Sequence, residues 1–150
     1  NTLPIDFYKK IIGDYDVDLI VGKTYNLLGK SKAAVVTSGT ATLETALFNV
    51  PQIVCYKGNY LSYLLAKNFI QVKYISLVNL ILDKPAVKEL IQSDLTIENL
   101  IVEFEKITQN EKVISEINND YKELTLKLEG KGASEKTAKS IINQLTKRND

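Results

Sequence analysis

The chain has no histidine, no methionine and no tryptophan, and it has a single cysteine, Cys55, among its 150 residues. One cysteine excludes a disulfide framework, and the lack of histidine disfavours a zinc site, so we expect no bound metal and no cofactor. The net charge of +1 gives no electrostatic basis for binding nucleic acid.

The chain also has no apolar run that approaches the ~20 residues needed to span a bilayer, and we expect no signal peptide. We therefore expect a cytoplasmic protein. Because methionine is absent and the chain opens at Asn1, we expect a piece of a longer or processed product whose start is missing. Its apolar content of 45% is sufficient for a proper core.

Residues 1–95 alternate between strand-like and helix-like patterns. We expect strands at residues 17–21, 35–37 and 52–56, and helices at residues 5–12, 24–28, 41–48 and 59–70. Residues 74–81 are expected to start extended and turn helical near Asn79, and Pro85 suits the first turn of a short helix that carries Glu89-Leu90-Ile91-Gln92. This alternation predicts an α/β fold with a parallel sheet and flanking helices.

Residues 96–150 show helical patterns alone, which predicts an all-helical C-terminal tail that packs on the first part. Thr96 is a plausible N-cap for the first of three helices. Apolar residues recur at helical spacing in each of them: Ile97, Leu100, Ile101, Phe104 and Ile107; Val113, Ile117, Tyr121, Leu124 and Leu128; Ala138, Ile141, Ile142 and Leu145. We expect Ser134 to cap the last helix, and we expect the apolar residues of that helix to be buried.

The candidate ligand site is the turn Ser38-Gly39-Thr40 between a predicted strand and a predicted helix. Such a turn aims unpaired N–H groups and two hydroxyls at one point, which suits a phosphate. Glu44 lies near enough to accept hydrogen bonds from both hydroxyls of a ribose. The alternatives are that Ser38 or Thr40 merely caps the helix, and that Glu44 is a favourable charge at the helix N-terminus.

Three further residues have candidate roles near this turn. Cys55 lies inside an apolar strand and is interpreted as a core residue. Lys57 follows that strand, where it either meets a phosphate or is a solvated lysine. Asn79 either contacts a nucleobase or sugar, or bridges loops. Neither a G-x-G-x-x-G nor a Walker pattern is present, which disfavours a dinucleotide oxidoreductase and a P-loop enzyme.

Four blocks in register resemble the C-terminal part of the lipid-A-disaccharide synthase family. They are Ser38-Gly39-Thr40-Ala41-Thr42-Leu43-Glu44, Val50-Pro51-Gln52-Ile53-Val54-Cys55-Tyr56-Lys57, Tyr74-Ile75-Ser76-Leu77-Val78-Asn79-Leu80 and Glu89-Leu90-Ile91-Gln92. The resemblance implies a Rossmann-like domain at residues 1–95, the half of a GT-B type glycosyltransferase that binds the UDP-sugar donor.

The resemblance also implies site residues and a reaction. Ser38, Gly39 and Thr40 would hold the diphosphate, Thr42 would support their turn, and Glu44 would take the ribose hydroxyls. Tyr56 and Asn79 would line the nucleotide pocket. The reaction implied is transfer of 2,3-diacylglucosamine from UDP to 2,3-diacylglucosamine 1-phosphate (lipid X), which yields the lipid A disaccharide 1-phosphate and UDP.

Catalysis would need the N-terminal half of such an enzyme, because no residue here matches its general base. We therefore expect this chain alone to bind UDP weakly and to catalyse no transfer. The resemblance further implies peripheral contact with the inner membrane and leaves a homodimer open. The alternatives are another UDP-sugar transferase or epimerase half-domain, and a non-enzymatic module for protein interaction.

Overall fold

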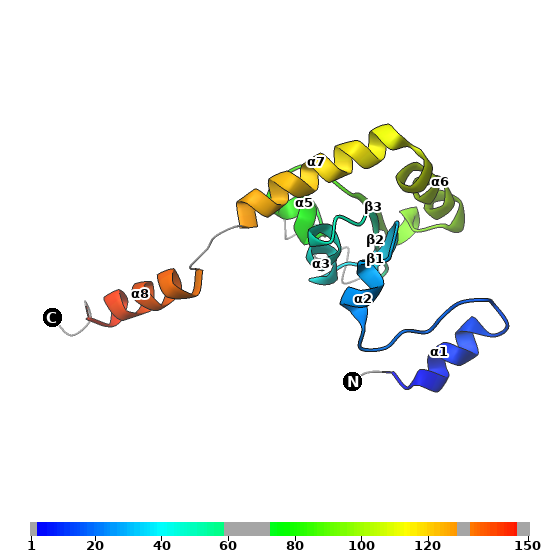
Figure 1. Ribbon diagram of the computed structural model, residues 1–150, viewed down its shortest axis with the longest axis horizontal. Helices are drawn as coiled ribbons and strands as arrows, with labels where there is room; N and C mark the ends of the chain where they lie inside the picture. Colours follow the sequence, from blue (N-terminus) through cyan, green and yellow to red (C-terminus); the bar gives the residue numbers. More distant parts are fainter. Residues whose placement is uncertain (1–2, 59–72, 129–132, 147–150) are drawn as a thin grey trace.

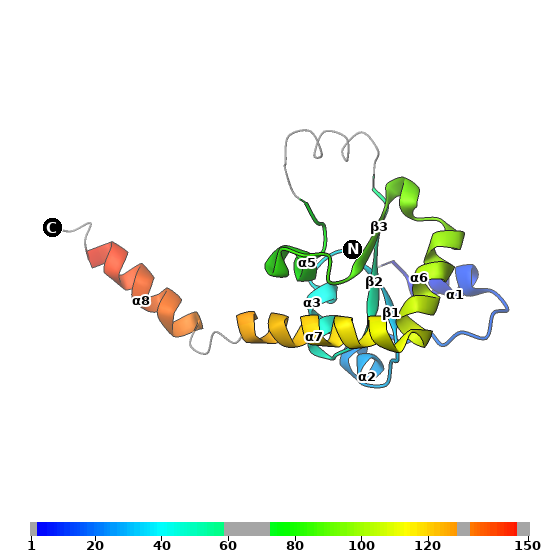
Figure 2. The same ribbon diagram turned by 90° about the horizontal axis from the view of Figure 1, so that it is seen from above.

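The computed structural model describes residues 3–58, 73–128 and 133–146, and its centre is a three-stranded parallel sheet. Strands β1 (Ala34–Thr37), β2 (Gln52–Tyr56) and β3 (Lys88–Ile91) lie in that order. Helices α3 (Ala41–Leu47) and α5 (Leu77–Leu82) cover one side of the sheet, and α6 (Ile97–Gln109) covers the other (Figure 1; Figure 2). The α/β class and the Rossmann-like sheet are therefore confirmed.

The register of the strands explains why the predicted helix at Glu89 to Gln92 is wrong. Val54 of β2 is paired with Glu89, and Cys55 is paired with Leu90, so this segment is the third strand of the sheet. Leu90 is 1% exposed. A four-residue run with a buried centre fits a strand or a helix equally well by local pattern, and pairing with β2 decides between them.

The chain before β1 differs from expectation in one segment. Helix α1 (Ile5–Ile12) ends at Gly13, whose φ of 56° and N–H bond to the Lys9 carbonyl match the predicted C-cap. Residues 17–21, predicted as a strand, have no regular structure and are exposed. Strands are stable only beside a hydrogen-bonded neighbour, and β1 pairs with β2 alone among the described residues. The short helix α2 (Thr24–Leu28) then leads to β1, as predicted.

Helix α7 (Glu111–Leu128) holds the sheet at the end where β2 begins. Its Tyr121 is fully buried; the hydroxyl donates to the Val50 carbonyl at 3.2 Å and accepts from Gln52 Nε2 at 3.1 Å. Burial raises the pKa of the Tyr121 phenol far above its ordinary value. Ile117 and Leu124, on the same stripe of α7, belong to the hydrophobic core. The predicted apolar face of this helix is therefore confirmed from Val113 to Leu124, whereas Leu128 at its end is 40% exposed.

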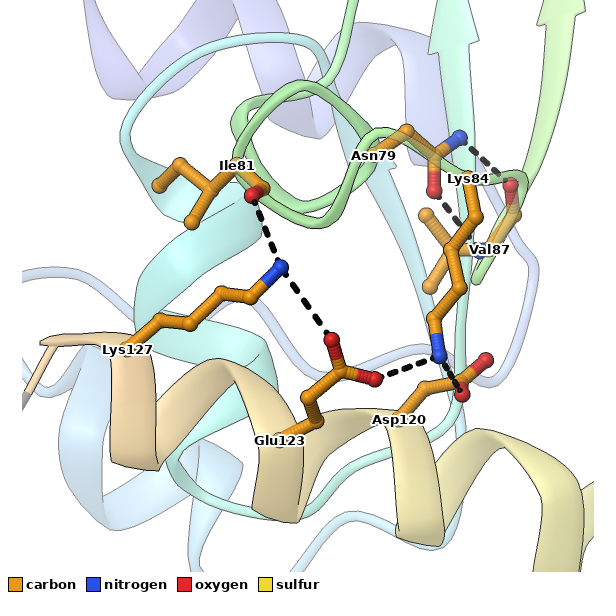
Figure 3. A network of polar contacts seen from close by, with 7 residues as sticks. All are labelled: Asn79, Ile81, Lys84, Val87, Asp120, Glu123 and Lys127. Atoms are coloured by element: carbon orange, nitrogen blue, oxygen red, sulfur yellow. Dashed lines mark hydrogen bonds and ion pairs between the residues drawn. The ribbon is translucent and has the colours of Figure 1, made fainter.

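An ion-pair network fastens α7 to the loop between α5 and β3. Lys84 Nζ lies 2.6 Å from Asp120 Oδ1 and 2.7 Å from Glu123 Oε2, and Lys127 Nζ lies 3.1 Å from Glu123 Oε1 (Figure 3). The hydrogen bonds to Asp120 and Glu123 raise the pKa of Lys84, and those from Lys84 and Lys127 lower the pKa of Glu123. The network holds the loop before β3 against α7.

The remaining helices meet expectation unevenly. Thr96 caps α6 by accepting the Asn99 N–H, as predicted. Helix α5 starts at Leu77, two residues before the predicted onset at Asn79, because Ser76 caps it. Short η1 (Gln92–Asp94) follows β3. Helix α8 (Ala133–Thr146) lies beyond the end of α7 and away from the sheet (Figure 1; Figure 2).

The apolar faces predicted for two further helices are not confirmed. The predicted burial of the α8 stripe is wrong at Ala138, Ile141 and Ile142, which are exposed because no part of the sheet lies against this helix. The helix predicted at residues 59–70 falls outside the described residues. None of the helices in the described ranges is long and apolar enough to cross a bilayer.

Candidate functional site

Three parallel strands bring the ends of distant segments to one edge of the sheet. Ser38 follows β1, Lys57 follows β2 and Gln92 follows β3, and the three strands run in the same direction. In open parallel sheets, ligands bind at the carboxyl ends of the strands. The predicted ligand turn at residues 38–40, here called the 38–40 turn, therefore lies at the edge where a site is expected.

The 38–40 turn presents free backbone donors. The Ser38 N–H bonds to the Cys55 carbonyl at 3.1 Å, which continues the pairing with β2. In the described part of the chain, the N–H groups of Gly39, Thr40 and Ala41 have no hydrogen-bond partner. Gly39 has a φ of 144°, a backbone conformation that favours glycine. Three successive donors are thus left for an anion at this point.

The hydroxyl groups of the turn have different surroundings. Thr42 is fully buried and its Oγ1 donates to the Gly39 carbonyl at 2.8 Å, so it supports the turn from inside. Ser38 Oγ donates to the Ile75 carbonyl at 3.2 Å, which leaves its oxygen able to accept but occupies its proton. Thr40 is exposed at the mouth of the turn. The exposed hydroxyl and the free N–H groups can therefore reach a ligand together.

Glu44, in the first turn of α3, lines a cavity of about 390 Å³. The other lining residues come from the chain before β1: Gly22, Lys23, Thr24, Tyr25 and Asn26. The Tyr25 hydroxyl donates to Glu44 Oε1 at 3.4 Å, and its ring stacks on Phe48 with centroids 5.5 Å apart. Sequence reasoning did not include residues 22–26, because nothing in their spacing shows that α2 returns them to α3.

Residues at the end of β2 lie on the same edge. Tyr56 is 37% exposed, and Lys57 beside it is exposed. A Cβ added at Gly58 would lie 2.8 Å from the Tyr56 hydroxyl, so this glycine leaves room for the ring. Burial raises the pKa of the half-buried Cys55 thiol, which fits the predicted packing role and not a nucleophile.

Asn79 makes side-chain hydrogen bonds inside the protein, which bear on its two interpretations. Its side chain is 1% exposed, and Nδ2 donates to the Val87 carbonyl and to Glu89 Oε1, both at 2.9 Å. Its Oδ1 accepts the Val87 N–H at 2.9 Å (Figure 3). Both amide protons are used inside the protein, so Asn79 has no donor left for a nucleotide. The structure supports the other interpretation, in which Asn79 bridges α5 and β3.

Sequence reasoning also missed two polar residues of β3 and its end. Glu89 accepts three hydrogen bonds, from the Ile75 and Ser76 N–H groups just before α5 and from Asn79 Nδ2 within it. Gln92 has a left-handed φ of 51°, and its Nε2 is buried without a partner among the described residues. Both were assigned to a helix in the prediction, which hid their position at the sheet. No group of three or more metal-ligating side chains occurs in the described ranges.

Comparisons with known proteins show which family the sequence matches. The sequence model of the lipid-A-disaccharide synthetase family matches residues 5–144. The lipid-A-disaccharide synthase of Syntrophus aciditrophicus is 39% identical over 150 residues, which cover 98% of this chain and 39% of that protein. The Colwellia psychrerythraea synthase is 30% identical over 90% of this chain and 34% of its own length. The Aquifex aeolicus synthase is 40% identical over 63% of this chain and 26% of its own length. The chain thus spans two fifths or less of the length of these curated relatives.

Proposed function

Because this chain belongs to the lipid-A-disaccharide synthase family, we propose that it supplies the donor-binding part of a glycosyltransferase. The whole enzyme would transfer 2,3-diacylglucosamine from its UDP derivative to 2,3-diacylglucosamine 1-phosphate (lipid X). The products would be the lipid A disaccharide 1-phosphate and UDP. We also propose that this enzyme acts in the cytoplasm, at the surface of the inner membrane, and that an N-terminal half completes its site.

The single observation that carries the proposal is the row of free N–H groups at Gly39, Thr40 and Ala41. They would donate to the diphosphate of UDP, together with the Thr40 hydroxyl. Charge develops on UDP as it departs from the sugar. Donors already fixed in direction stabilise that charge without reorganisation. The 38–40 turn would therefore stabilise the leaving group.

The nucleoside would occupy the cavity beside Glu44. Ala41 and Glu44 are three residues apart on α3, so they lie on one face of the helix. A diphosphate on the turn would then place the ribose near the Glu44 carboxylate, which accepts hydrogen bonds from two neighbouring hydroxyls. Tyr25 and the other residues lining the cavity would surround the ribose and base. The group that takes the proton of the acceptor hydroxyl is proposed to lie outside this chain.

A titration of the chain with UDP, followed by amide resonances in two-dimensional NMR, tests this proposal. We expect the resonances of Gly39, Thr40 and Ala41 to move together at millimolar UDP. No turnover of donor and acceptor is expected from the chain alone. Unchanged turn resonances at millimolar UDP would refute the donor-site assignment.

Replacing Glu44 by alanine tests the ribose contact. The loss of charged hydrogen bonds to two hydroxyls should weaken UDP binding about ten-fold and leave pyrophosphate binding little changed. Glu98→Ala is the matched control, because Glu98 also lies in the first turn of its helix, but on α6, which covers the other side of the sheet from α3 (Figure 1; Figure 2). An equal loss for UDP and pyrophosphate would show that Glu44 does not contact the ribose.

A further inference from the structure

Glu89 connects β3 to the start of α5 with one half-buried carboxylate. Oε2 accepts the Ile75 N–H at 3.0 Å, and Oε1 accepts the Ser76 N–H at 2.8 Å and Asn79 Nδ2 at 2.9 Å. A carboxylate can accept at both oxygens, so this side chain holds two successive peptide groups and an amide at once. The position of the Ile75–Ser76 backbone therefore depends on Glu89.

The same peptide segment contacts the 38–40 turn on its other side. The Ile75 carbonyl accepts the Ser38 hydroxyl at 3.2 Å. Strand β2 lies between β1 and β3, so Glu89 and Ser38 come from strands that do not pair with each other. Two hydrogen bonds in series, through Ile75, connect the carboxylate in β3 with the turn after β1.

We propose that Glu89 is a positioning residue for the UDP site, acting through Ile75 on Ser38. This inference rests on the proposed function, since it takes the 38–40 turn as the place where the diphosphate binds. With Glu89 in place, the Ile75 carbonyl keeps the Ser38 hydroxyl in one orientation, and the donors next to it keep their direction. A site organised before binding loses less conformational entropy when the ligand arrives.

A double-mutant cycle on UDP affinity tests the connection. Glu89→Gln removes an acceptor and places amide protons against backbone donors, so we expect UDP binding to weaken roughly three- to ten-fold. In a Ser38→Ala background the connection is already cut, and Glu89→Gln should then have little further effect. Glu103→Gln is the matched control. Glu103 lines the same cavity of about 410 Å³ as Glu89 but pairs with Lys106 of its own helix.

The outcomes separate this inference from the proposed function. If the unaltered chain does not bind UDP, the proposed function fails. If the unaltered chain binds UDP and the Glu89→Gln variant binds it equally well, the positioning role is overturned. The role is also overturned if Glu89→Gln lowers UDP affinity by the same factor in the Ser38→Ala background as in the unaltered chain. If a variant does not fold, a measurement on the unaltered chain still tests the role. Ser76 is fully buried, so UDP should move the amide resonance of Ser76 only through the 38–40 turn. An unmoved Ser76 resonance in a chain that binds UDP also overturns the role.

Discussion

Replacing Asn79 by alanine distinguishes a residue that binds nucleotide from one that holds the fold. The substitution removes three hydrogen bonds of 2.9 Å, two to the Val87 backbone and one to Glu89, at a position that is 1% exposed. Each such bond contributes a net ~0.5–1.5 kcal/mol, and buried groups left without partners add to the cost. We therefore expect the free energy of unfolding to fall by about 2–4 kcal/mol.

Urea unfolding followed by circular dichroism measures this change directly. Asn99→Ala is the control, because the Asn99 amide makes a similar bond to the Asp94 carbonyl on the exposed surface, where a loss within ~0.5 kcal/mol is expected. UDP affinity is measured on the same samples below the unfolding transition. An Asn79→Ala chain with unchanged stability and lost UDP binding would refute the structural role and support the nucleotide contact implied by the resemblance.

Two further predictions concern the anchoring of α7. Tyr121→Phe should lower the free energy of unfolding by about 1–2 kcal/mol in urea melts, because Gln52 Nε2 loses a buried acceptor; Tyr15→Phe, at an 80% exposed position, should change it little. The lowered pKa of Glu123 means that its carboxylate stabilises the fold above its ordinary pKa, and that this contribution is lost as the pH falls through the lowered value. Lys84→Met should therefore raise the pKa of Glu123 in a carboxyl-carbon NMR titration, and an unchanged value would contradict the ion pair.

Segments governed by local pattern were predicted well from the sequence. The strand at residues 52–56 and the helix that starts at Ala41 appear with nearly the expected bounds. The segments that failed depend on distant partners. Residues 88–91 are a strand because β2 lies beside them, and residues 17–21 are not a strand because nothing among the described residues pairs with them. A short apolar run does not carry this information.

The candidate site also combines features set by local pattern with features that depend on distant partners. The 38–40 turn and Glu44 could be found from the sequence, because a strand, a glycine turn and a helix follow one another directly. The cavity beside Glu44 and the role of Glu89 could not, since their partners come from residues 22–26 and from Ile75. Asn79 was assigned to the nucleotide pocket through the resemblance, and its bonds to Val87 and Glu89, which favour the bridging alternative, arise only in the folded chain. The contacts of Ser38, Gly39, Thr40, Thr42, Glu44 and Tyr56 with UDP stay predictions.

Tyr121 secures β2 where the strand begins, and the 38–40 turn lies where the strands end, a five-residue strand or ~16 Å away. We therefore expect substitutions to be tolerated better around the cavity beside Glu44 than at the Tyr121 end of the sheet. The residues around the cavity beside Glu44 can change while the interior under α7 keeps its packing. Changes at Tyr121 would instead cost the hydrogen bonds that its hydroxyl makes to Val50 and Gln52.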